Sequence, residues 1–254
     1  MKPLDRALSL RRSTRLRSME PVRVFHNRLR EPRRLLRLAE QKANAQSTRF
    51  EARRQFLVAV TAASELFWRV FVRINVDRCR LRSSTLDRLR KMTFTLADVQ
   101  TIAGRRLSLG ELIAASYSFQ GTNAVNVAFS EILQINVFSE FANESFAIVE
   151  MEWYKVVKDA ALGSAGAPGR KWTKAREPLI TTIEGRDILK RDSAMVDRCY
   201  AVRHDAVHSS GRNHRVGAEE ALRIENSVWE FNVVLGLFLE TRFDKLWGPR
   251  RDRE

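Results

Sequence analysis

Cysteine is scarce in this sequence, with two residues among 254. Cys79 and Cys199 both fall in helix-like patterns, so we expect buried free thiols in a reducing compartment and not a disulfide scaffold. Long uncharged runs are also missing, since no stretch approaches the roughly 20 apolar residues of a membrane helix. Arginines interrupt the short apolar pieces near the N-terminus, which argues against secretion. We therefore expect a cytoplasmic protein with no membrane contact.

Strand-type alternation, a glycine-rich phosphate loop and internal repeats are also absent from the pattern of the sequence. Apolar residues instead recur with helical spacing, and the composition (44% hydrophobic, 30% charged) suits a soluble core. The sequence thus predicts an all-α fold, a helical bundle. We expect helices over about 47–76, 108–118, 123–133, 137–162 and 218–243. A further helix should start after Pro178, or afresh near Asp187, and end close to His208.

Positive charge dominates and is unevenly distributed. The formal net charge is +15, and residues 1–48, with thirteen basic and four acidic side chains, carry +9 of it. The pattern predicts a basic N-terminal arm over 1–46, partly helical or disordered, with Pro32 in the first turn of a helix over 31–38. The main helical domain should span 47–245, with a flexible loop at 163–170 and a C-terminal tail at 246–254.

A basic arm of this kind commonly contacts polyanions, and Arg11 and Arg12 would hold RNA phosphates without reading sequence. The arginines of the arm could also have an origin unrelated to RNA. An arginine-rich composition arises from GC-rich DNA as well, and translation could begin at Met19, so residues 1–18 need not belong to the protein.

Three of the four histidines fall between Met195 and Val216, together with two arginines: His204, His208, His214, Arg203 and Arg212. Apolar residues before them fit one helical face, and Ser209 to Gly211 then break the pattern. A histidine can accept or donate a proton near neutral pH. An arginine keeps its charge and can hold phosphate with two hydrogen bonds. This stretch is therefore the candidate functional segment.

The run from Arg203 to His208 resembles the signature of the HEPN superfamily, an arginine and a histidine separated by four to six residues at a helix end. A loop to about Gly217 and a final apolar helix follow here in the same order. The stretches 56–69 and 118–120 also look like one branch, RiboL-PSP-HEPN. The resemblance implies a homodimeric, metal-independent endoribonuclease without a cofactor, in bacterial defence or a toxin–antitoxin pair, with an antitoxin or regulatory protein as partner.

The resemblance also implies roles for individual residues. Arg203 and His208 would be catalytic, and His204 would position the phosphate or the nucleophile. Asp205 would fix an imidazole tautomer, and Arg212 and His214 would bind RNA. Glu65 either orients an active-site basic group or pairs with Arg69 at i+4.

Helical geometry limits the catalytic interpretation, because five steps of about 100° place Arg203 and His208 roughly 140° apart. The site then requires either an early helix end or a second subunit. His204 and His208 share a face and could bind zinc with Cys199 or His214, although a fourth ligand is missing. The segment could equally belong to a non-catalytic RNA- or protein-binding module, or be a plain basic helix end.

Overall fold

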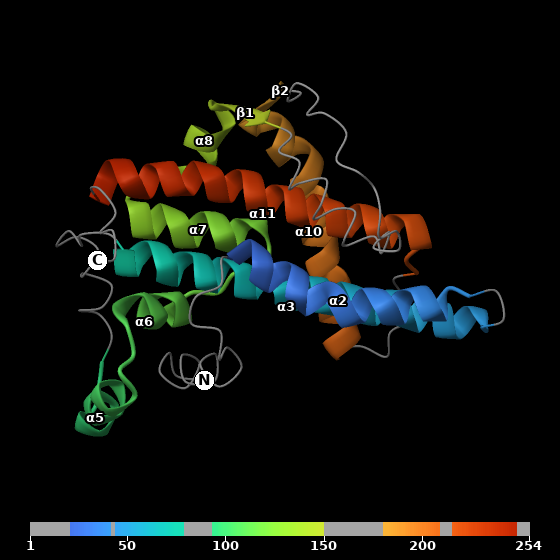
Figure 1. The fold of residues 1–254 in the computed structure, drawn as a ribbon, viewed down its shortest axis with the longest axis horizontal. Coiled ribbons are helices and arrows are strands. Elements are labelled where there is room, and N and C mark those ends of the chain that lie inside the picture. Colours follow the sequence, from blue (N-terminus) through green and yellow to red (C-terminus); the bar gives the residue numbers. More distant parts are fainter. Residues whose placement is uncertain (1–20, 42–43, 79–92, 150–179, 209–214, 248–254) are drawn as a thin grey trace, which may run out of the picture.

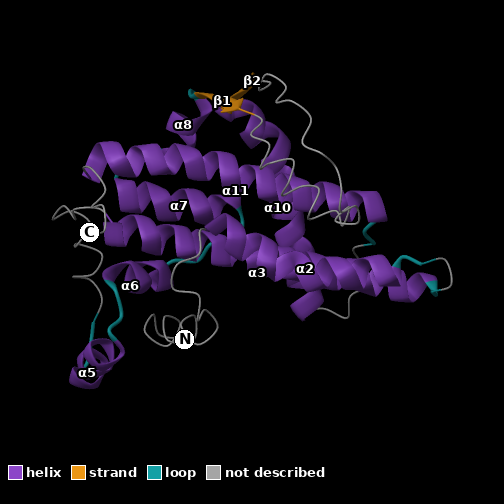
Figure 2. Cartoon of the chain, viewed as in Figure 1, coloured by secondary structure: helices purple, strands orange, loops and turns teal. Residues whose placement is uncertain are grey.

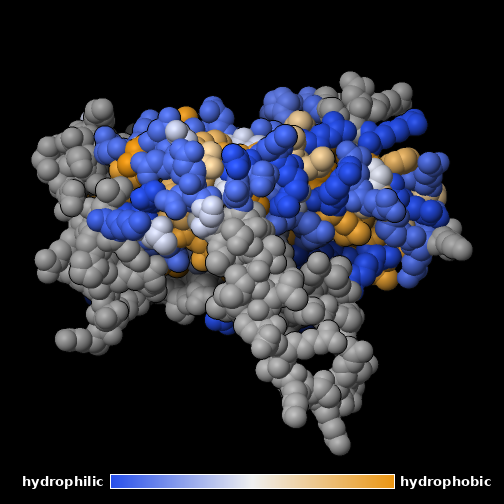
Figure 3. Space-filling model, turned by 90° about the horizontal axis from the view of Figure 1, so that it is seen from above, coloured by the Kyte–Doolittle hydropathy of each residue, from blue (hydrophilic) through white to orange (hydrophobic). Residues whose placement is uncertain are grey.

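A computed structural model describes residues 21–41, 44–78, 93–149, 180–208 and 215–247. These residues form eight helices and one short two-stranded ribbon, so the predicted all-α fold is confirmed (Figure 2). Within these ranges no helix is both long and apolar enough to cross a membrane. On the face seen from above, the described residues are mostly hydrophilic, with hydrophobic residues scattered between them (Figure 3).

The elements follow one another as shown in Figure 1: α2 (Pro21–Ala39), α3 (Gln46–Arg78), α5 (Leu96–Arg105), α6 (Leu109–Ser116), α7 (Thr122–Leu133), α8 (Val137–Ala142), β1 (Ser145–Val149), β2 (Ile180–Glu184), α10 (Gly185–His208) and α11 (Ala218–Trp247). The helices expected from 47, 123 and 218 are present, and the motif helix begins near Asp187 and ends at His208, as predicted.

The long helix α3 is the centre of the bundle and packs against α2, α6, α10 and α11. Its wide apolar stripe supplies four aromatic side chains to the core: Phe56, Phe67, Trp68 and Phe71. Trp68 and Phe71 meet Phe129 of α7 edge to face, with ring centroids 5.3 and 5.8 Å apart. The apolar middle of α11 is buried against the same cluster. α10 crosses these helices steeply, whereas α5 extends away from the bundle (Figure 1).

Local sequence signals explain several helix starts. Ser108 and Glu111 form a capping box at α6, and Thr95 and Asp98 form another at α5. α7 differs, because its N-cap residue Gly121 has no side chain to offer. Asp197 of α10 accepts from the Thr122 backbone N–H at 2.9 Å instead. This cap comes from a helix 75 residues away, so no local pattern reveals it.

The helix predicted over 137–162 is wrong for residues 145–149, which form a strand. α8 ends at Ala142, and residues 145–149 pair antiparallel with 180–184, Ser145 facing Glu184. The β-branched run in the second strand favours extended backbone. The pairing partner lies beyond an undescribed segment, so helical spacing alone misled the prediction. Residues 150–162, the loop 163–170 and Pro178 lie outside the described residues.

The first turn of α10 lies directly against α8. A Cβ added to Gly185 would lie 1.9 Å from the backbone oxygen of Phe141, so only glycine allows this contact. The contact fixes where the motif helix starts.

The N-terminal helix α2 is longer than expected. It begins at Pro21, and Pro32 therefore lies inside it and not in its first turn, which corrects the prediction for 31–38. Burial of an apolar side explains the extension, since Phe25 and Leu29 are fully buried in the main core. α2 packs along α3 (Figure 1). The proposed domain boundary at 46 stays a prediction.

Candidate functional site

The last turns of α10 carry the two motif histidines side by side. The ring centroids of His204 and His208 are 4.7 Å apart, and the planes are tilted by 48°. Both side chains are exposed, and His208 lies in the final helical turn. The i, i+4 spacing therefore produces the shared face that the sequence predicted.

Arg203 points from α10 toward the central helix. Its Nη1 donates to Oε1 of Glu65 on α3. Glu65 Oε2 also lies 4.0 Å from Nη2 of Arg69, one turn along the same helix. The Arg203 and Glu65 side chains are 28% and 13% exposed, so water screens their attraction only in part. The pairing expected between Glu65 and Arg69 is thus present, and the same carboxylate also contacts Arg203.

Arg203 and His208 make no contact with each other in the described part of the chain. Arg203 is held by α3, whereas His208 is exposed beside His204. This separation matches the roughly 140° expected on a regular helix. One protomer therefore presents the imidazole pair and the guanidinium on different sides of α10.

The inner side of α10 holds the motif in place. Cys199 is buried, and its Sγ lies 3.6 Å from the backbone oxygen of Leu57, while burial raises the pKa of the thiol. Tyr200 donates to the backbone oxygen of Phe119 at 2.9 Å, and burial raises the pKa of the phenol. Both groups stay protonated near neutral pH and act as anchors between helices.

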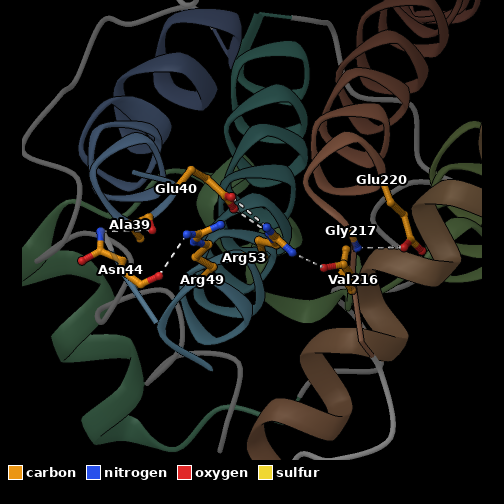
Figure 4. Close-up of polar contacts among 8 residues, drawn as sticks. All are labelled: Ala39, Glu40, Asn44, Arg49, Arg53, Val216, Gly217 and Glu220. Atoms are coloured by element: carbon orange, nitrogen blue, oxygen red, sulfur yellow. Dashed lines mark hydrogen bonds and ion pairs between the residues drawn. The ribbon is translucent and has the colours of Figure 1, made fainter. Parts of the chain in front are cut away.

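Two arginines near the start of α3 contact the chain on both sides of the segment 209–214. Arg54 Nη2 donates to the backbone oxygen of Asp205 at 3.3 Å, in the last turn of α10. Arg53 Nη1 donates to the backbone oxygen of Val216 at 3.2 Å, just before α11 (Figure 4). The carboxylate of Glu40 holds the other side of Arg53, with Nη2 2.7 Å from Oε2. The N-terminal part of α3 thus holds the last turn of α10 and the residues just before α11.

The sequence interpretation missed these two arginines. In the sequence, Arg53 and Arg54 follow Arg49 and look like ordinary charged residues at the start of an amphipathic helix, so nothing marks them as contacts of the functional segment. The backbone oxygen of Asp205, the residue expected to hold an imidazole, accepts from Arg54. Four predicted RNA-binding residues lie outside the described residues: Arg11, Arg12, Arg212 and His214.

The described residues contain no group of three or more His, Cys, Asp or Glu side chains arranged to hold a metal ion. Cys199, one of the two possible zinc partners of the histidine pair, lies inside the bundle against Leu57 and is not beside the exposed imidazoles. The second, His214, is not described.

Comparisons with protein-family models, with curated proteins and with solved structures find no match to this chain.

Proposed function

We propose that this protein is a metal-independent endoribonuclease that acts as a homodimer. The observation that supports it best is the exposed His204–His208 pair at the end of α10, next to Arg203, which Glu65 of α3 holds. The resemblance of this stretch to the HEPN signature supplies the reaction class. From the same resemblance we propose a cytoplasmic role in bacterial defence or in a toxin–antitoxin pair, restrained by an antitoxin or regulatory protein.

The proposed reaction needs three groups. A base removes the proton from a 2′-hydroxyl, whose oxygen attacks the adjacent phosphorus while the bond to the 5′-oxygen breaks. A cation stabilises the charge that develops on the phosphorane oxygens, and an acid protonates the leaving 5′-oxygen. The products are a 2′,3′-cyclic phosphate and a 5′-hydroxyl. His208 is the proposed proton-transfer group, which takes the 2′-hydroxyl proton as the base and then gives it to the leaving 5′-oxygen as the acid. His204 positions the phosphate, and Arg203 is the proposed cation.

A dimer explains how Arg203 and His208 could act together although they lie on different sides of α10. In the proposed assembly, Arg203 of one protomer and His208 of its partner complete a shared site. Glu65 would then hold the guanidinium in one orientation, since a bound carboxylate limits its rotation.

A specific observation favours a second function, a non-catalytic RNA- or protein-binding module. Arg203 is already paired with Glu65, and an arginine neutralised by a carboxylate attracts a phosphate less strongly. In that case the HEPN-like segment would serve structure and association only.

The test is incubation of purified protein with a mixed RNA pool in EDTA. Wild type is compared with R203A, H204A and H208A, and with V207A as the matched control, because Val207 is exposed between the two histidines. Circular dichroism checks the folding of each variant. We expect V207A and wild type to leave 2′,3′-cyclic phosphate ends and H208A to leave none. Equal cleavage by all variants, or no cleavage by wild type, would exclude the proposed site.

A mixing experiment tests the shared site. R203A and H208A, each inactive alone, should recover part of the activity when subunits exchange, because one intact site forms in each mixed dimer. Light scattering measures the oligomeric state. A monomeric wild type that still cleaves RNA would refute the dimeric arrangement while leaving the nuclease itself.

A further inference from the structure

The N-terminal helix α2 has two faces of different chemistry. Its inner face carries Phe25, Leu29 and Leu36 into the main core. Its outer face carries exposed arginines at positions 23, 30 and 34, which we call the α2 basic row. α2 lies on the outside of the bundle, along α3 (Figure 1). The row is therefore on the molecular surface and on a helix that the core holds in place.

The three arginines project in nearly one direction. With about 100° per residue, Arg23, Arg30 and Arg34 fall within an arc of about 40°. They span about 16 Å along the helix axis. Arg37, also exposed, continues the row. This spacing presents a line of positive charge that matches an extended polyanion.

Acidic neighbours on the same helix do little to neutralise the row. Glu31 is the only acidic residue within α2, and its carboxylate lies 3.4 Å from Arg34. Both side chains are well exposed, 65% and 70%, so this pair is weak. Arg23 and Arg30 form no ion pair with any residue that the structure describes.

Further arginines of the same region are structural, and their partners fix α2 in place. Arg33 Nε donates to Glu225 of α11 at 2.6 Å, and both side chains are largely buried. Glu40, just after α2, binds Arg53 of α3. The row is consequently fixed before any ligand arrives, so binding costs little conformational entropy of the backbone.

We propose that the α2 basic row binds the phosphate backbone of the RNA substrate. This inference rests on the proposed function and adds a docking surface separate from the cleavage residues. Charge complementarity favours a polyanion. A membrane surface fits less well, because an interfacial helix inserts a broad apolar face into the lipid. In α2, Phe25, Leu29 and Leu36 are already in the core, and the large apolar side chains left exposed are those of Leu35 and Leu38.

The experiment measures binding of a fluorescent 2′-O-methyl RNA 20-mer of mixed sequence at several salt concentrations. This strand cannot be cleaved through its 2′-oxygen, so binding is separated from catalysis. The variants are R23Q/R30Q/R34Q and R23K/R30K/R34K. The matched control is R105Q/K190Q/K245Q, which removes the same charge from exposed positions on α5, α10 and α11.

Three lost phosphate contacts should flatten the slope of log Kobs against log salt by about 2, since each contributes about 0.7 for a single strand. At 0.1 M salt the glutamine triple should bind at least roughly tenfold more weakly. The lysine triple should keep most of the affinity, because it retains the charges. The control should keep the wild-type slope.

Three results would overturn the docking surface. The first is an unchanged slope in the glutamine triple, and the second is an equal loss of affinity in the control. The third is arginine-dependent binding to phosphatidylserine–phosphatidylcholine vesicles without binding to RNA. The nuclease proposal fails separately. RNA binding that depends on the α2 basic row, without any cleavage, would refute the nuclease and keep the docking surface. Cleavage by wild type, with binding unchanged in the glutamine triple, would keep the nuclease and refute the docking surface.

Discussion

The guanidinium of Arg203 donates from Nη1 to Oε1 of Glu65, joining α10 to α3 across 138 residues of sequence. Glu65 also lies within 4.0 Å of Arg69, so one carboxylate serves two cations. This cluster ties the motif helix to the central helix of the bundle. It also determines which way the proposed catalytic arginine points.

Removing this carboxylate should destabilise the fold. E65A leaves Arg203 and Arg69 as partly buried like charges, so the free energy of unfolding should fall by about 1–3 kcal/mol. E65Q retains an acceptor and should cost less. Urea unfolding measures both, and E51A is the control, because the Glu51 side chain is 55% exposed and only pairs along the surface of α3. Equal stability of E65A and E51A would show that the ion pair does not form in solution.

The close contact between α10 and α8 predicts that Gly185 does not tolerate a larger side chain. G185A places a Cβ 1.9 Å from the Phe141 backbone oxygen, so α10 must shift, at a cost of about 1–3 kcal/mol. G104A is the matched control, because a Cβ at Gly104 of α5 meets nothing within 4 Å. Replacing a helical glycine there should stabilise by about 0.5–1 kcal/mol. Thermal unfolding compares the two, and a G185A protein as stable as wild type would contradict the packing described.

Burial of the His26 imidazole predicts that the free energy of unfolding depends on pH. Its ring lies 4.3 Å from Trp229, its Nε2 is buried without a hydrogen-bond partner among the described residues, and its Nδ1 lies 3.5 Å from Arg33. Burial, followed by the Arg33 charge, lowers the pKa of His26 to about 4. The unfolded chain binds a proton below its ordinary value of 6.5, whereas the folded protein stays neutral until about 4.

Stability is therefore fully present above about pH 6.5 and falls as the pH drops toward 4. Between pH 7 and pH 5, wild type should lose more stability than H26Q, by on the order of 1 kcal/mol after solvent screening at this half-buried site. Urea unfolding at both pH values measures the difference. Parallel losses in the two proteins would show that His26 titrates normally.

Arg54 predicts local order at the end of α10. It donates to the Asp205 backbone oxygen, and its positive charge also interacts favourably with the helix dipole at the C-terminus of α10. R54A should release the last turn, with faster amide exchange over 205–208 and a loss of about 0.5–1.5 kcal/mol. Hydrogen exchange read by mass spectrometry resolves this segment. The control is R186A, at the exposed start of α10, which should leave amide exchange over 205–208 unchanged. If these amides stay protected in R54A, the contact of Arg54 does not order the last turn.

Sequence pattern was sufficient where the decisive information is local. Apolar residues at helical spacing predicted helices over 47–76 and 108–118, which the structure contains as α3 and α6. The i, i+4 spacing of His204 and His208 predicted their shared face, and the same geometry predicted that Arg203 would point elsewhere.

The pairing of residues 145–149 with 180–184 and the cap of α7 by Asp197 were missed, because both partners lie far apart in sequence. The start of α2 was predicted wrongly because Pro32 was placed in the first helical turn. Pro32 lies inside the helix instead, since the packing of Phe25 and Leu29 outweighs the lost hydrogen bond.

The sequence by itself determined the helical class and the position of the imidazole pair, because both depend on periodicity within one helix. Only the tertiary structure decided that Glu65 holds Arg203, that Arg53 and Arg54 fix the chain on both sides of 209–214, and that α2 presents its arginines from a rigid base. The physical reason is that these contacts join side chains and backbone from separate helices, and their geometry exists only once the core has packed.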